Sequence, residues 1–225
     1  MATGQDGTVQ FASWLAVEPV PFVPEVVLHQ AEDLQGLWEA TGAAAPPYWA
    51  FAWLGGQALA RYVLDGDHVR GHRVLDLATG SGLVAIAAHK AGARSVLAAD
   101  IDPLSQQAVQ ANSAANRTDV MWTGLDLLDG PVPHVDVVLA GDVLYEPIMA
   151  ARVLTWLQGF DGRVLLGDPG RDYLPQTGLT ELAAYEIATS RELEGVPVKR
   201  TRIFTLDPGL TTATTKTSSG PTGQA

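Results

Sequence analysis

Two aspartates and two glycines occur at a spacing that suits the binding of a nucleoside. Asp76 is the one acid inside a short apolar run, Gly80 and Gly82 follow it, and Asp100 ends the next apolar run. Glycines let the chain turn tightly and let a ligand approach the backbone without a Cβ in the way. A carboxylate at Asp100 can accept hydrogen bonds from both hydroxyls of a ribose. The pattern therefore predicts a strand–turn–helix–strand unit that binds a nucleoside.

The glycine spacing alone leaves the ligand open. Gly80-x-Gly82-x-x-Ala85 also fits the dinucleotide fingerprint, and a purely structural turn is a further alternative. In a dinucleotide site the Asp76 carboxylate would lie beside a pyrophosphate, and at ~4 Å this repulsion costs about 4 kcal/mol. S-adenosylmethionine instead carries an ammonium and a sulfonium, so the same acid attracts it. Asp76 thus favours S-adenosylmethionine over a dinucleotide.

The elements that must position these residues alternate along the sequence. Apolar runs predict strands at residues 74–77, 95–100, 120–122, 135–140 and 163–167, and helices are expected at 83–91, 103–116 and 148–157. Residues 185–193 and 200–206 alternate apolar and polar side chains without room for a helix between them, which predicts an antiparallel hairpin. The expected fold class is α/β, with a doubly wound, mostly parallel seven-stranded sheet and a C-terminal antiparallel hairpin.

The two ends of the chain have a different character. We expect a flexible N-terminus at residues 1–21, an N-terminal helical cap at 22–72, the sheet domain at 73–207 and a disordered, low-complexity tail at 208–225. Within the cap, residues 25–39 form a short amphipathic element and residues 43–47 a linker. Residues 49–64 are expected to form one helix, broken or bent at Gly55 and Gly56.

The composition limits the classes of partner and compartment. The net charge of −11 disfavours DNA or RNA as the main partner and suits a partner that offers lysine. Cysteine is absent, which excludes disulfides and thiolate metal sites and fits a reducing cytoplasm. No apolar stretch approaches the ~20 residues of a membrane span, so we expect no membrane partner. The five histidines form no convincing ligand set, so no metal is expected.

Further polar residues follow the later strands. Asp126 comes after the third strand, where its carboxylate could accept a hydrogen bond from an adenine amino group, although a helix cap or turn acid is the alternative. Asp142 and Tyr145 lie just beyond the fourth strand, at the sheet edge where open α/β folds bind ligands. An exposed loop acid is the alternative for Asp142. Trp49 and Trp53 lie one helical turn apart, which fits either a site or a core aromatic stripe.

Several of these motifs together resemble a known family. The motifs are Pro47-Tyr48-Trp49-Ala50-Phe51, Trp53-Leu54-Gly55-Gly56-Gln57-Ala58-Leu59, the glycine turn at 74–82, Asp100-Ile101-Asp102-Pro103, Asp142-Val143-Leu144-Tyr145 and Gly167-Asp168-Pro169-Gly170-Arg171. They look like the seven-β-strand protein lysine methyltransferases, and most like those that modify the electron transfer flavoprotein β-subunit, with their bacterial relatives. The resemblance covers roughly residues 22–206. One departure is Ala78-Thr79, where relatives often have a glycine at the first position.

The resemblance implies a Rossmann-like methyltransferase domain at residues 73–207 that uses S-adenosylmethionine as cofactor. It implies that Asp142 and Tyr145 face the target lysine, and that the cofactor is bound by Trp53, Asp76, Gly80, Ser81, Gly82, Asp100, Ile101, Asp126 and Ala140. The implied substrate is a protein with an accessible lysine. The electron transfer flavoprotein β-subunit is the first choice, a ribosomal protein the second and a small, nicotinamide-like amine the third. A non-enzymatic binding module is a further alternative, and the oligomeric state is left open.

Overall fold

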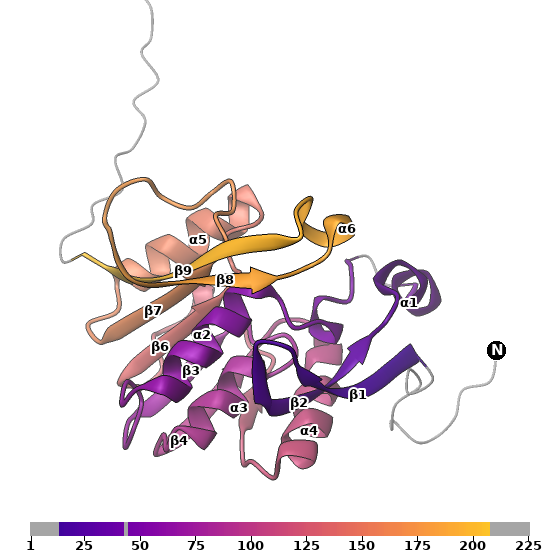
Figure 1. Cartoon of the computed structure of the whole chain (residues 1–225). Helices are drawn as coiled ribbons and strands as arrows, with labels where there is room; N and C mark the ends of the chain where they lie inside the picture. Colours follow the sequence, from indigo (N-terminus) through magenta and orange to yellow (C-terminus); the bar gives the residue numbers. More distant parts are fainter. Residues whose placement is uncertain (1–13, 43–44, 208–225) are drawn as a thin grey trace, which may run out of the picture.

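The computed structural model describes residues 14–42 and 45–207, and within them one seven-stranded sheet forms the centre of the molecule (Figure 1). Its strand order is β5-β4-β3-β6-β7-β9-β8. The first five run parallel, whereas β9 pairs antiparallel with both β7 and β8. The strands are β3 (Arg73–Leu77), β4 (Ser95–Ala99), β5 (Met121–Thr123), β6 (Val137–Gly141), β7 (Arg163–Asp168), β8 (Leu179–Ala188) and β9 (Val198–Leu206). The predicted fold class, five parallel strands followed by an antiparallel hairpin, is confirmed.

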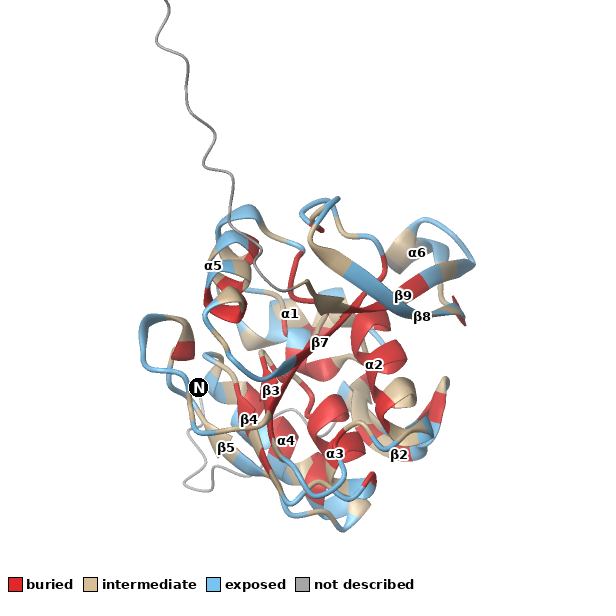
Figure 2. Ribbon diagram, turned by 90° about the vertical axis from the view of Figure 1, so that its left-hand side faces the viewer, coloured by how far each residue is buried: buried red, intermediate tan, exposed pale blue. Residues whose placement is uncertain are grey.

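Helices cover both faces of this sheet. On one face lie α2 (Leu54–Asp65), α3 (Leu83–Lys90) and α4 (Pro103–Asn116), and on the other lie α5 (Pro147–Gln158) and the 3-10 turn η3 (Leu127–Asp129). The central strands read as nearly continuous apolar runs because both of their faces are buried. Figure 2 shows the buried residues concentrated in these strands and on the helices that pack against them.

Helix α2 lies unusually close to the carboxyl ends of β6 and β7. A Cβ at Gly55 would come within 2.6 Å of the backbone nitrogen of Asp142 and still closer to the carbonyl oxygen of Gly167. Only glycine permits this approach, because any side chain would overlap the strand backbone. The prediction of one helix over residues 49–64, broken or bent at Gly55 and Gly56, is therefore wrong. These glycines form the first turn of α2, which begins at Leu54 after a separate 3-10 turn, η2 (Tyr48–Ala50).

The N-terminal region differs from the predicted helical cap. Residues 15–31 form an antiparallel hairpin of β1 (Leu15–Val20) and β2 (Val23–Ala31), followed by α1 (Leu34–Thr41). Its buried side chains, Val20, Val23, Val26 and Leu28, pack on Ala60 of α2 and on α3, so the hairpin covers the outer side of the helical layer (Figure 1). We predicted a helical cap because the spacing of the apolar residues fits the stripe of an amphipathic helix. In the structure the same apolar side chains belong to strands, whose buried face packs against the helices α2 and α3. Within the expected flexible N-terminus at residues 1–21, residues 15–20 form β1; residues 1–13 and the expected tail at 208–225 lie outside the described residues.

The C-terminal hairpin is present with different bounds. Strand β8 begins six residues before the predicted start and ends at Ala188, and a short helix, α6 (Arg191–Glu194), occupies the connection that we expected to hold none. Among the helices of the described residues, none is long and apolar enough to cross a bilayer.

Candidate active site

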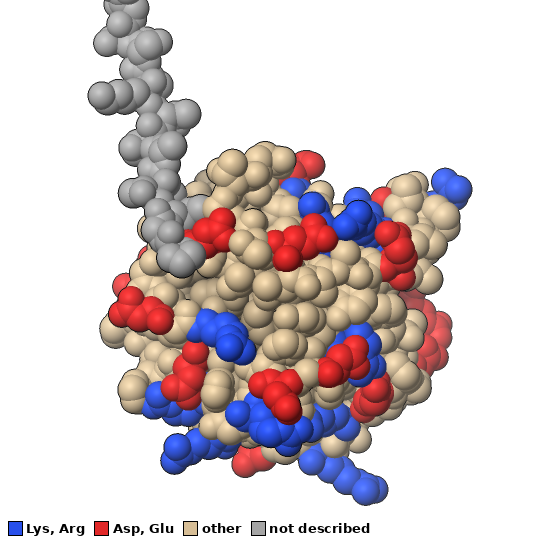
Figure 3. All heavy atoms as spheres, turned by 60° about the vertical axis from the view of Figure 1, so that its left-hand side comes forward, with Lys and Arg blue, Asp and Glu red and all other residues tan. Residues whose placement is uncertain are grey.

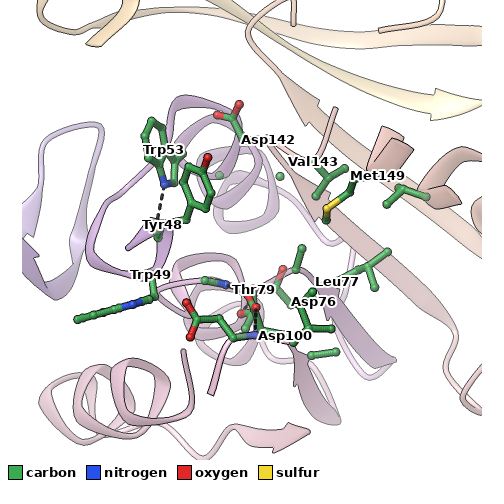
Figure 4. A pocket seen from close by; sticks show the side chains of 18 of the residues that line it. Tyr48, Trp49, Trp53, Asp76, Leu77, Thr79, Asp100, Asp142, Val143 and Met149 are labelled. Carbon is green, nitrogen blue, oxygen red and sulfur yellow. Dashed lines mark hydrogen bonds between the residues drawn. The ribbon is translucent and has the colours of Figure 1, made fainter. Parts of the chain in front are cut away.

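A cavity of about 420 Å³ opens at the carboxyl ends of β3, β4 and β6 (Figure 4). Figure 4 shows Asp76, Thr79 and Asp100 together at one end and Asp142 with Tyr48 and Trp53 at the other. This is the edge of a parallel sheet where ligands bind in open α/β folds. We call the two parts the acidic end and the acceptor end of the cavity.

Asp76, at the acidic end, is 1% exposed and sits in the last half of β3. Its Oδ2 accepts hydrogen bonds from the hydroxyl of Thr79 at 2.5 Å and from the backbone N–H of Ala85 at 3.0 Å. Burial raises the pKa of Asp76 to about 7, against the opposing effect of these two donors. A cationic ligand next to this buried carboxylate would stabilise its ionised form, which burial otherwise disfavours.

The glycine turn after β3 uses three left-handed residues, Ala78, Gly80 and Gly82, with φ of 54°, 52° and 81°. Ala78 occupies such a conformation at a steric cost that a glycine would not have, which explains why relatives often have glycine at this position. Two side chains of α4 hold the turn: Ser105 donates to the carbonyl of Gly80, and Asn112 donates to that of Ser81. Our sequence reasoning missed both, since no local pattern links residues 25 to 31 positions apart.

Asp100 lies directly after β4, and its two oxygens accept backbone N–H groups of Gly80 at 2.8 Å and Asp102 at 2.9 Å. Burial raises the pKa of this carboxyl as well, although these donors oppose the shift. Each carboxylate oxygen can accept a second hydrogen bond. The predicted contact with ribose hydroxyls is therefore compatible with this geometry.

Asp126 lines the cavity and also caps η3. Its Oδ1 accepts the N–H of Leu128 at 3.1 Å, and its Oδ2 pairs with Arg152 at 2.8 Å. The capping role is the alternative that we held beside an adenine contact. The two roles are compatible, because one carboxylate can cap a turn and still face the cavity.

Asp142 is 8% exposed, so it is not the exposed loop acid of the alternative interpretation. It follows β6 with a left-handed φ of 60°, a conformation that aspartate tolerates better than most residues. Its Oδ2 accepts the N–H of Gly55 at 2.7 Å, and its Oδ1 accepts Nε of Arg171 at 2.6 Å. Burial raises the pKa of Asp142, whereas Arg171 and the Gly55 N–H lower it. The close packing of α2 therefore positions this acid.

Aromatic rings surround the acceptor end. The ring of Tyr48 lies 5.2 Å from that of Tyr145 and 5.7 Å from that of Trp53, centroid to centroid. Trp53 donates its indole N–H to the carbonyl of Tyr48 at 2.9 Å, which fixes the approach to α2. Burial raises the pKa of Tyr145 to about 12, so its hydroxyl stays protonated. Trp49 packs in the core with Leu37 and Ala108 and also lines the cavity, so the two interpretations of this residue are compatible.

The cavity brings together most of the residues predicted for the site. The lining includes Trp53, Asp76, Gly80, Ser81, Asp100, Ile101, Asp126, Asp142 and Tyr145. Two predicted residues lie outside it. Gly82 faces α4, where a Cβ would meet Val109 at 3.2 Å, and Ala140 is fully buried in the core, with Gly141 reaching the cavity in its place. Among the described residues, no group of three or more acids and histidines is arranged to hold a metal ion.

The titration of Asp76 gives a testable pH dependence. A cationic ligand binds the carboxylate, and the unliganded site is half protonated near pH 7. We therefore expect the dissociation constant of S-adenosylmethionine to fall about tenfold from pH 6 to pH 8. Calorimetric titration at several pH values measures this change. Asp76→Asn should bind more weakly and without this pH dependence; a wild-type affinity that stays flat over the range would contradict the assignment.

The strand order of the sheet and the cavity at the carboxyl ends of its parallel strands are those of the Rossmann-like methyltransferase fold. Residues 57–155 match the model of the ribosomal protein L11 methyltransferase (PrmA) family. The solved structure of a ribosomal protein L11 methylase from Lactobacillus delbrueckii subsp. bulgaricus is 26% identical and has a TM-score of 0.50, over 70% of this chain and 81% of that one.

Two relatives indicate a more specific family. The electron transfer flavoprotein beta subunit lysine methyltransferase of Xenopus laevis is 33% identical over 201 residues, which cover 84% of this chain and 82% of that protein. The corresponding Rattus norvegicus protein is 40% identical over 151 residues, 63% of this chain. That alignment spans 59% of the rat protein's length. The chain belongs to the family of electron transfer flavoprotein beta subunit lysine methyltransferases, and the resemblance inferred from the motifs is confirmed.

Proposed function

We propose that the protein transfers a methyl group from S-adenosylmethionine to lysine amines of another protein. The observation that carries the proposal is one cavity with two ends, Asp76 and Asp100 at the first and Asp142 with Tyr145 at the second. The acidic end suits the ammonium and the ribose of the cofactor. The acceptor end offers a carboxylate and aromatic faces, which suit an alkyl amine. Membership of a lysine methyltransferase family supports the same assignment.

The chemistry needs alignment more than acid–base catalysis. Methyl transfer is a direct displacement in which the amine nitrogen attacks the methyl carbon and the sulfonium leaves as a thioether. Holding amine, methyl and sulfur in line supplies most of the rate. The amine must be neutral, and a lysine with an ordinary pKa costs about 4.6 kcal/mol to deprotonate at pH 7. The positive sulfonium and the desolvated cavity lower that cost, and the proton passes to water. Asp142 orients the amine.

A protein substrate fits the surroundings of the acceptor end better than a small amine. Exposed apolar side chains follow the carboxyl ends of β6 and β7, namely Tyr145, Ile148 and Tyr173, and the partly exposed ring of Tyr48 contacts that of Tyr145. Exposed apolar groups gathered at one opening are typical of protein contact surfaces. The electron transfer flavoprotein β-subunit is our first choice, because relatives of that name align over most of this chain. We keep a cytoplasmic location as a prediction from the composition.

A ribosomal protein is the second candidate. The matching family model describes ribosomal protein L11 methyltransferases, but it covers only residues 57–155. This segment contains the acidic end and Asp142, and it ends before Arg171 and the C-terminal hairpin. It therefore supports the shared cofactor chemistry more than a shared substrate.

A substrate comparison tests the proposal directly. We expect label from S-adenosylmethionine to enter a lysine of the electron transfer flavoprotein β-subunit faster than it enters ribosomal protein L11, and free nicotinamide to react least. Peptide mass spectrometry locates the modified lysine. Equal or faster methylation of nicotinamide would overturn this order.

The salt dependence of the same assay reports on steering. The net charge of −11 attracts a basic surface loop, although acidic and basic side chains are interspersed on the face shown in Figure 3. Raising the ionic strength should increase KM for the protein more than it lowers kcat. An unchanged KM between low and physiological salt would contradict steering.

A further inference from the structure

Three segments that are distant in sequence meet beside the acceptor end through one arginine. Nε of Arg171, in the turn after β7, donates to Oδ1 of Asp142 at 2.6 Å. Its Nη2 and Nη1 donate to the two carboxylate oxygens of Glu194, at 2.8 and 3.1 Å. Glu194 lies in α6, the connection between β8 and β9. We call Asp142, Arg171 and Glu194 the triad.

The triad is buried and its charges do not cancel. The side chains of Asp142 and Glu194 are 7% and 4% exposed, and that of Arg171 is 21% exposed. Two carboxylates and one guanidinium leave a net charge of −1, and both Asp142 and Arg171 line the cavity. An unbalanced buried charge is costly, so a cation placed in the cavity stabilises it.

The other titratable groups that face Asp142 do not supply this cation. Asp168, at the end of β7, is fully buried, and its Oδ1 accepts the backbone N–H groups of Gly170 and Arg171 at 2.6 and 2.8 Å. Its carboxyl adds negative charge whenever it is ionised. Tyr145 is neutral as a phenol. From α2, Asp142 receives only the backbone N–H of Gly55.

We propose that Arg171 and Glu194 are positioning residues that hold Asp142 and leave the triad one positive charge short, so that the acceptor end binds the substrate lysine as its ammonium form. This inference rests on the proposed function. Each oxygen of Asp142 accepts one hydrogen bond within the protein and can accept another from the ammonium. The ammonium then loses its proton to water before the methyl group is transferred. Glu194 thereby links the β8–β9 connection to substrate binding.

Two substitutions change the charge of the triad in opposite directions. Glu194→Gln changes it from −1 to 0, which destabilises the bound ammonium; the acidic limb of kcat against pH should move to lower pH by roughly one unit, and KM should rise. Arg171→Met changes it from −1 to −2 and should move the limb to higher pH. The assay uses labelled S-adenosylmethionine and the electron transfer flavoprotein β-subunit. A merely structural role predicts no opposite shifts.

Two further variants control for folding. Arg171→Lys keeps the charge and should restore the limb close to its wild-type position, with reduced kcat because lysine lacks the planar fork that contacts both acids. Asp136→Asn removes another Asp–Arg ion pair, Asp136 with Arg73 at 2.6 Å, which is more exposed and lies just before β6 at the opposite end of the sheet. It should leave the acidic limb of kcat against pH unmoved, even if it lowers the melting temperature.

A second readout needs no substrate. Carbon-detected NMR titration of the Asp142 carboxyl in the free protein should show a lower pKa in Glu194→Gln and a higher pKa in Arg171→Met. If Arg171→Met does not fold, Arg171→Lys replaces it and should leave the pKa of Asp142 close to its wild-type value, because the positive charge is kept. Opposite shifts in the pKa of Asp142 support the charge balance of the triad. If they occur while the wild-type enzyme methylates none of the tested proteins, the proposed function is wrong and the inference about the triad is not. Shifts in the same direction, or none in Glu194→Gln, overturn the inference.

Discussion

Asp142→Asn is expected to lower kcat/KM for a protein substrate by at least about 100-fold, because the amine loses the charged group that orients it. The affinity for S-adenosylmethionine should stay within about threefold, since Asp142 lies at the acceptor end and Asp76 and Asp100 at the other. Asparagine retains a carbonyl oxygen for the N–H of Gly55 or for Arg171, so the local packing is disturbed as little as possible. Methylation kinetics and calorimetry of the cofactor measure the two quantities separately.

Asp129→Asn is the matched control for this variant. Asp129 also pairs with an arginine, Arg152 at 2.8 Å, but its side chain is 76% exposed and does not line the cavity. The control should retain wild-type kinetics. Asp142→Asn leaves Arg171 paired with Glu194, so the remaining buried pair is balanced in charge and no large loss of stability is expected. A variant that keeps its turnover at saturating cofactor and loses cofactor affinity would place Asp142 on the wrong side of the reaction.

Gly55→Ala is expected to destabilise the protein by about 3 kcal/mol or more, the cost of overpacking where backbone cannot yield. The new methyl group would lie 2.6 Å from the nitrogen of Asp142 and closer to the carbonyl of Gly167. Both atoms belong to the strand ends that form the acceptor end. Methylation activity should therefore fall together with the free energy of unfolding, which urea titration measures.

Gly56→Ala tests whether this effect is specific. The added Cβ would lie 3.8 Å from the nearest atoms, the side chains of Leu83 and Val84, an ordinary packing distance. Because alanine is also the better helix former by about 1 kcal/mol, the stability should be unchanged or slightly higher. The two glycines are adjacent in sequence and in the same helical turn, so equal effects of the two substitutions would show that the close approach of α2 does not matter.

The strand–turn–helix–strand unit could be predicted from the sequence because its determinants are local. The apolar runs, Gly80 and Gly82, and Pro103 at the start of α4 act on their immediate neighbours, and the structure places all of these elements within a few residues of the predicted bounds. The position of Asp76 and Asp100 at one sheet edge follows from the same pattern, since parallel neighbours end on the same side.

Other features required contacts between segments that are distant in sequence. Residues 23–31 form a strand that covers the helical surface of α2 and α3, and residue 55 must be glycine because the backbone of Gly167 approaches it. The charge around Asp142 depends on Arg171 and Glu194, which lie 29 and 52 residues away along the chain. The sequence by itself therefore determined the type of sheet and the cofactor chemistry, which depend on local patterns. Only the tertiary structure decided how the acceptor end is packed and charged, because burial and ion pairing depend on which segments meet in space.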